Sequence, residues 1–166
     1  MTDTAFDPGG FYEFDLGRGT VRTQAGSRVV VLSDNVLAPL VSAAATQGDL
    51  TAVRRLGKQL GEQILGNVGG DVTVAPPARV LGHAAAVLGL FGWGRLGFER
   101  WGDALVDTLT DMPVLDDAQL GVAALLGGIF TSLGGREVAC VPVSGAMFLL
   151  VDPGIADHVW NWAQEG

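Results

Sequence analysis

The side chains that could carry chemistry are few and far apart in this sequence. Cys140 is the only cysteine, His83 and His158 are the only histidines, and no HxxxH, HExxH or CxxC spacing is present. A metal or haem site needs several such ligands to converge, so the sequence predicts none. His83 would be the first candidate ligand, but on an apolar helix we expect a hydrogen-bonded core or interface histidine.

Nucleophiles and phosphate-binding loops are also missing. Ser132 and Ser144 lack the GxSxG turn, and Cys140, between apolar neighbours on an expected strand, is predicted to be a buried, inert thiol. Gly92 and Gly94 follow a helix and precede a strand, the reverse of a phosphate loop. With no nicotinamide or flavin motif, we expect no catalytic residue, no cofactor and no metal.

The carboxylates have structural explanations. Asp116 and Asp117 precede an apolar segment and are expected to start a helix, because carboxylates are favoured at helix N-termini. Asp103, Asp107 and Asp111 could form an acidic rim on a hairpin, and a solvated face is the simpler interpretation.

Composition excludes several classes of protein. The 166 residues fit one domain, and 10 basic against 18 acidic side chains give a net charge of −8, which disfavours binding to nucleic acid. The N-terminus lacks the pattern of a signal peptide, and no apolar run reaches the ~20 residues of a membrane helix. We expect a soluble cytoplasmic protein without membrane insertion, with a flexible arm at residues 1–10 and a single domain at 11–166.

Hydrophobic periodicity and turn residues predict the elements that hold these side chains. The helix at 78–91 is apolar almost all round and is therefore expected at the centre. Pro142 places its strand at a sheet edge or a bulge. The expected strands are 11–16, 21–24 and 27–32, with hairpins at 96–101/104–110 and 137–143/146–151; the expected helices are 34–47, 50–65, 78–91, 116 or 117 to 133, and 154–164.

Four segments in this order resemble the 4-vinyl reductase-type domain, which is grouped with the core subunits of the TRAPP vesicle-tethering complex. They are SRVVVLSDNVLAPLV at 27–41, VRRLGKQLGEQI at 53–64, GWGRLGFERWGDALV at 92–106 and LLGGIFTSLGGREVACVPV at 125–143. The resemblance implies an α+β fold in which a helical layer packs on a twisted antiparallel sheet. It also implies a dimer and a hydrophobic interior that can hold an apolar ligand.

The chain departs from this family in two places. Sensor-type members bind zinc through cysteines just after the Arg-Glu strand, where this chain has Gly145 and a shortened loop. The acylated cysteine of TRAPP subunits lies in the first helical region, where this chain has no cysteine. Neither role is transferred to Cys140. Over 80–109 and 125–134 the chain also resembles, more briefly, the small ring-forming subunit of bacterial cellulose synthase complexes.

Two sets of residues are candidates for binding. Aromatic side chains around the apolar helix either complete the core or, as the resemblance implies, line a slot for a hydrophobic ligand. Apolar positions on the first two helices, and two tryptophans near the end of the chain, are candidates for an oligomer or partner surface. The ligand set is Phe91, Trp93, Phe98, Trp101, Phe130 and Phe148; the interface set is Val41, Ala44, Val53, Leu60, Trp160 and Trp162.

These observations favour a non-catalytic module that forms a homodimer or higher homo-oligomer. It would bind a small hydrophobic molecule or act as an assembly adaptor for a protein partner. Two alternatives stay open: a structural subunit of a larger ring, as in cellulose synthase, and an accessory subunit of a tetrapyrrole-type reductase.

Overall fold

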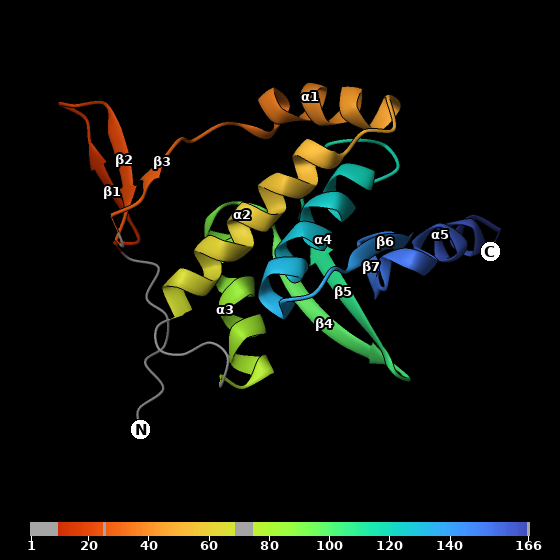
Figure 1. Ribbon diagram of the computed structural model, residues 1–166. Helices are drawn as coiled ribbons and strands as arrows, with labels where there is room; N and C mark the ends of the chain where they lie inside the picture. The colour runs from red at the N-terminus through yellow and green to blue at the C-terminus, as the bar shows by residue number, and fades with distance from the viewer. Residues whose placement is uncertain (1–9, 25, 69–74, 166) are drawn as a thin grey trace. The chain divides into compact units, whose positions relative to one another are not determined.

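The computed structural model describes residues 10–24, 26–68 and 75–165, which divide into two units (Figure 1). Contacts group Met1–Ser33 in one unit and Asp34–Gly166 in the other, whereas the sequence predicts one domain over 11–166. The arm expected at residues 1–10 lies outside the described residues except for Gly10. Each unit is described by itself below.

The first unit is a three-stranded antiparallel sheet. Its strands are β1 (Tyr12–Asp15), β2 (Thr20–Thr23) and β3 (Arg28–Val29), in the order β1-β2-β3. The third strand is shorter than the expected 27–32, because its ladder with β2 ends at Val29 and the residues from Val30 to Leu32 are exposed. A β-branched run alone does not extend a strand beyond its pairing partner.

The second unit packs helices on a four-stranded antiparallel sheet, which confirms the α+β class. The sheet order is β4-β5-β7-β6. Pro142 lies on the edge strand β6, beside an irregularity in its ladder, as predicted. The elements are α1 (Asp34–Thr46), α2 (Thr51–Val68), α3 (Pro77–Leu90), β4 (Arg95–Trp101), β5 (Ala104–Thr110), α4 (Leu120–Gly134), β6 (Ala139–Ser144), β7 (Met147–Val151), a 3-10 turn (Pro153–Ile155) and α5 (Ala156–Glu165).

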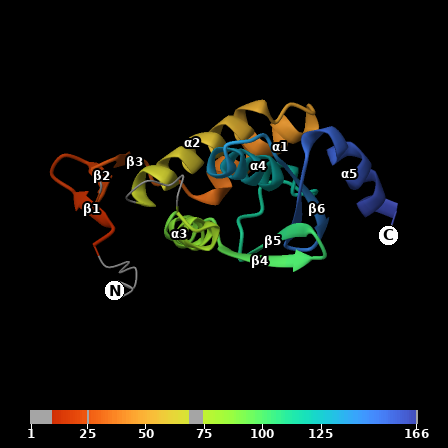
Figure 2. The same ribbon diagram turned by 60° about the horizontal axis from the view of Figure 1, so that its bottom comes forward.

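The central helix is α4, and not the helix at 78–91 that the sequence favoured. Figure 2 shows α4 between α2 and the sheet, and its side chains from Gly121 to Thr131 are buried except that of Ala124. By contrast, α3 buries one face only, at Val80, Ala84, Val87 and Leu88. The rest of α3 includes Arg79, His83 and several alanines and glycines, which can face water at little cost. No helix among the described residues is long and apolar enough to cross a membrane.

Asp116 caps α4 from outside the helix. The helix begins at Leu120, later than the expected 116 or 117, after Gln119 adopts a left-handed conformation with φ 59°. The Asp116 carboxylate accepts hydrogen bonds from the backbone N–H groups of Leu120 (2.8 Å) and Gly121 (2.7 Å). The predicted role of this carboxylate at the helix N-terminus is therefore confirmed, although the chain turns once more before the helix starts.

The Gly-Trp-Gly junction turns the chain from α3 into the predicted hairpin. Gly92 and Gly94 have φ values of 78° and 103°, which disfavour residues with a Cβ. A Cβ at Gly94 would also lie 2.5 Å from the carbonyl oxygen of Thr110 on β5. These glycines have the structural role that was expected. They allow the tight turn that leads into β4, the strand that carries Phe98.

Glycines also let α2 and α4 pack with their backbones in contact. A Cβ at Gly57 of α2 would overlap the carbonyl of Leu125, and one at Gly128 of α4 would overlap the carbonyl of Arg54. A Cβ at Gly61 would lie 2.8 Å from a backbone oxygen of α4. Such close packing leaves no room for a methyl group unless one helix moves.

The substitution Gly57→Ala is therefore expected to destabilise the protein. We expect the free energy of unfolding to fall by about 3 kcal/mol, at the upper end of overpacking costs, measured by denaturant titration with circular dichroism. The control is Gly66→Ala on the same helix, where no atom lies within 4 Å of the added methyl. That variant should gain up to about 1 kcal/mol from helix propensity, and equal effects of the two substitutions would contradict the close contact.

Candidate functional site

Asp107 lies inside the second unit, in the middle of the sheet. It is on β5, directly opposite Phe98 of β4 and Phe148 of β7 in the antiparallel register. Residues opposite each other in adjacent strands project from the same face of a sheet. The Asp107 side chain therefore shares a face with both phenylalanines, and its exposed fraction is 0%.

This face of the sheet is turned toward α4. The ring of Phe98 packs edge-on against the ring of Phe130 on α4, with 5.9 Å between centroids. Phe130 and Phe148 are buried, and Phe98 is half-buried on the edge strand. Three of the six predicted ligand-binding aromatics thus converge, from three different elements, on the strand positions around Asp107.

The Asp107 carboxyl group has no hydrogen-bond partner among the described residues. Neither Oδ1 nor Oδ2 is paired. Burial raises the pKa of this group to about 8, opposed by a smaller effect of its own backbone N–H. Desolvation disfavours the charged form, so Asp107 is a neutral carboxylic acid at pH 7.

The sequence interpretation of Asp107 as part of a solvated rim was wrong. Asp103 and Asp111 are exposed, but Asp107 is not. The missed signal is the two-residue alternation of the strand, which places Asp107 in line with Leu105 and Leu109 on the face toward the core. A carboxylate in an apolar row is a clearer indication of a site than one in a polar row.

The other predicted aromatics lie at the border of this cluster or away from it. Phe91 and Trp93, at the junction of α3 and β4, are half-buried and pack against the core. Trp101 is 49% exposed at the far end of β4, where its indole N–H donates to a Glu99 carboxylate oxygen at 3.2 Å. It therefore does not join the three buried rings.

Cys140 and His83 are both removed from water, fully or in part. Cys140 is buried on β6, and burial raises the pKa of its thiol well above the usual value. His83 is half-buried on α3, where burial and the nearby Arg79 charge lower its pKa. In the part of the chain that the structure describes, no three His, Cys, Asp or Glu side chains are grouped to bind a metal ion.

Three of the four interface positions predicted on the first two helices pack into or against the core. Val53 is buried in the hydrophobic core, which removes it from an oligomer face. Val41 and Leu60 pack against that core, and Ala44 is half-buried. The sequence pattern identified the apolar face of each helix but not the direction in which that face points.

The two tryptophans of α5 separate as their spacing predicts. Trp160 is half-buried, whereas Trp162 is 64% exposed. Residues two apart on a helix face different directions, so only one can pack against the neighbouring strand β6. Trp162 remains available as a surface contact.

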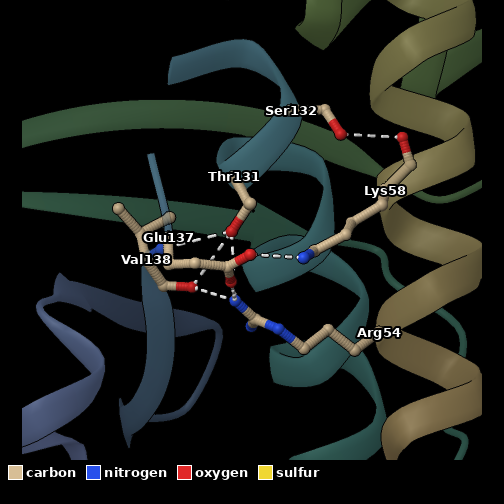
Figure 3. A network of polar contacts seen from close by, with 6 residues as sticks. All are labelled: Arg54, Lys58, Thr131, Ser132, Glu137 and Val138. Carbon is tan, nitrogen blue, oxygen red and sulfur yellow. Dashed lines mark hydrogen bonds and ion pairs between the residues drawn. The ribbon is translucent and has the colours of Figure 1, made fainter. Parts of the chain in front are cut away.

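A polar network ties α2 to α4 and to the start of β6 (Figure 3). The Glu137 carboxylate is paired with Arg54 at 2.7 Å and with Lys58, and both cations come from α2. The same Arg54 nitrogen donates to the Thr131 hydroxyl (3.0 Å) and to the Val138 carbonyl (2.7 Å). Hydrogen bonds from Lys58 and Arg54 lower the pKa of Glu137.

An open depression of about 370 Å³ adjoins this network. It is lined by Glu62, Thr131, Ser132, Gly135, Arg136 and Glu137. The Ser132 hydroxyl donates to the Lys58 carbonyl at 2.9 Å, and the cations of α2 are already paired with Glu137. The polar groups of Thr131, Ser132 and Glu137 bond within the chain, so the network holds the fold together. Because the depression is open and polar, we take the interior cluster as the better candidate for a binding site.

The chain is similar in structure to a solved sensory domain. This is the phenol-responsive sensory domain of the transcription activator PoxR, crystallised with phenol; the TM-score is 0.66, and the match covers 90% of this chain and 91% of that chain. The sequences are 11% identical, so the similarity shows a shared fold. No protein-family model and no curated protein matches this sequence.

The raised pKa of Asp107 predicts an unusual pH dependence of stability. The folded protein keeps a proton that the unfolded chain releases near pH 4, so this residue makes the fold less stable as the pH rises from about 4 to about 8. Asp107→Asn removes that titration. The free energy of unfolding of the variant minus that of the wild type should therefore increase, by on the order of 3 kcal/mol, as the pH is raised from 5 to 8.

The measurement is the free energy of unfolding by denaturant, at several pH values, for both proteins. The lowered pKa of His83 acts in the opposite direction, but it is common to both proteins and cancels in the difference. Parallel curves for the two proteins would show that Asp107 is ionised in the folded state, contrary to its burial.

Proposed function

We propose that this chain is a non-catalytic sensory module that binds a small aromatic molecule between α4 and strands β4, β5 and β7. The observation that carries the proposal is the convergence of Phe98, Phe130 and Phe148 on one buried carboxyl group. Small-molecule sites combine mostly apolar, aromatic walls with a few polar groups that fix orientation. This cluster has both components in the interior of the larger unit.

The structural comparison supports the same class of ligand. The protein with the similar fold is described as phenol-responsive and was crystallised with phenol. Phenol has an aromatic ring and one hydroxyl group. The rings and the carboxyl group of this chain offer complementary chemistry, an apolar surface and one hydrogen-bonding group.

The edge strand β4 is the proposed entrance. Phe98 is half-buried on this strand, and Phe91 and Trp93 are half-buried at the junction that precedes it. Side chains at an edge can move without breaking the central ladder between β5 and β7. Phe91 and Trp93 are therefore assigned to the entrance and Phe98 to the binding surface.

Titration with phenol, toluene and benzyl alcohol, followed by isothermal calorimetry, tests the proposal. We expect saturable binding of at least one ring compound, and Phe98→Leu should weaken it about fivefold through the loss of an aromatic contact. The matched control is Phe14→Leu, at an exposed phenylalanine of the other unit, which should bind like the wild type. Absence of saturable binding by all three compounds would refute the proposed function.

A homodimer through the outer surfaces of α1 and α2 is proposed for the assembly. Its support is the exposure of Val36 and Leu40 on α1 and of Leu56 on α2, with Leu40 at 69%. Exposed apolar groups of this kind are typical of contact surfaces.

Light scattering after size-exclusion chromatography tests the dimer. The wild type should have twice the monomer mass at micromolar concentration, and Leu40→Glu should weaken the dimer about tenfold by placing a charge in an apolar contact. Gln164→Glu, which adds the same charge at an exposed position of α5, is the control. A wild-type protein that stays monomeric at high micromolar concentration would rule the dimer out.

A further inference from the structure

The surroundings of Asp107 leave its carboxyl group without a partner from the fold. Its strand neighbours Phe98 and Phe148, and Phe130 across from Phe98, offer rings and no conventional hydrogen-bonding group. The Cys140 thiol on β6 is near enough for Asp107 to raise its pKa, but it makes no hydrogen bond to the carboxyl group. The backbone of β5 is paired with β4 on one side and with β7 on the other. A buried polar group that stays unpaired loses its hydration without compensation, so a partner that satisfied it would be favoured.

We infer that Asp107 is the specificity-determining residue of the proposed site, and that it selects neutral aromatic molecules with one group that both donates and accepts a hydrogen bond. A hydroxyl or a carboxamide is such a group. This inference rests on the proposed function, and it deepens it by naming the class of ligand.

The chemistry of a protonated carboxyl group explains the choice of a neutral partner. Its O–H donates one hydrogen bond and its carbonyl oxygen accepts another, so a hydroxyl-bearing ring satisfies both atoms. The raised pKa of Asp107 keeps the group in this form near neutral pH. A ring without a polar group would leave both oxygens unpaired.

Charged ligands are disfavoured by the same surroundings. A cationic amine would have to ionise Asp107 and lose its own hydration, and a buried ion pair without further hydrogen bonds gains little. An anion would find one O–H donor, the weakly donating Cys140 thiol and three apolar rings, which do not replace its water shell. The site is therefore expected to reject both charges.

Four ligands with the same ring and similar length test this selection: benzyl alcohol, toluene, benzylamine and benzoate, at pH 7. In the wild type, benzyl alcohol should bind about tenfold more tightly than each of the other three, the difference made by one well-placed hydrogen bond. Asp107→Asn keeps a neutral donor and acceptor and should keep the preference for the alcohol. Asp107→Leu should bind toluene at least as well as the alcohol.

A second measurement keeps the inference testable if Asp107→Leu does not fold. The infrared difference spectrum of the wild type on adding benzyl alcohol should show a shift of the protonated carboxyl C=O band, and Asp107→Asn should lack that signal. If benzyl alcohol binds without this shift, Asp107 does not contact it and the inference is overturned.

The outcomes separate the two proposals. If rings bind but Asp107→Leu keeps the tenfold preference for the alcohol, or if benzylamine binds best to the wild type, the inference fails and the proposed function stands. If none of the four compounds binds to folded wild-type protein or to folded Asp107→Asn, both fail. A preference for benzyl alcohol that Asp107→Asn keeps and Asp107→Leu loses supports both proposals.

Discussion

Gly57, Gly61 and Gly128 bring the backbones of α2 and α4 into contact, and this contact fixes where α4 lies on the sheet. With a larger side chain at any of these positions, the two helices would have to separate by more than neighbouring atoms can absorb. At the observed distance, Arg54 and Lys58 of α2 also reach Glu137 beside α4. Close packing and the polar network thus hold the same three elements: α2, α4 and the start of β6.

The position of α4 in turn creates the surroundings of the buried carboxyl group. One side of this helix contacts α2, and another carries Phe130 to the ring of Phe98 on the sheet. Asp107 lies next to Phe98 in the register and is sealed from water. Because an apolar interior disfavours charge, the same packing that stabilises the fold keeps this acid protonated. The protonation of Asp107 therefore depends on the contact between α2 and α4, because this contact holds α4 against the sheet.

The sequence predicts helices, strands and turns that depend on local patterns. It does not predict features that depend on which helices and strands pack against each other. Alternation and turn glycines correctly predicted the hairpin of β4 and β5, and Pro142 correctly indicated an edge strand. The choice of central helix was wrong. The sequence of α4 contains no charged residue, whereas α3 contains Arg79 and His83, and the glycine contacts with α2 place α4 at the centre. Of the site, the three phenylalanines were among the candidates. Asp107 was not, because the two-residue alternation that aligns it with Leu105 and Leu109 was not applied to it.

A fully apolar residue at position 107 would fill this part of the core at lower cost. Leu105 and Leu109 occupy the same face of β5, so a leucine would continue the row, whereas the acid leaves two polar atoms unpaired and weakens the fold as the pH rises. Positions where a sequence departs from the requirements of its own fold are where function is expected. Packing alone does not explain the unpaired acid, whereas the proposed ligand would complete its hydrogen bonds.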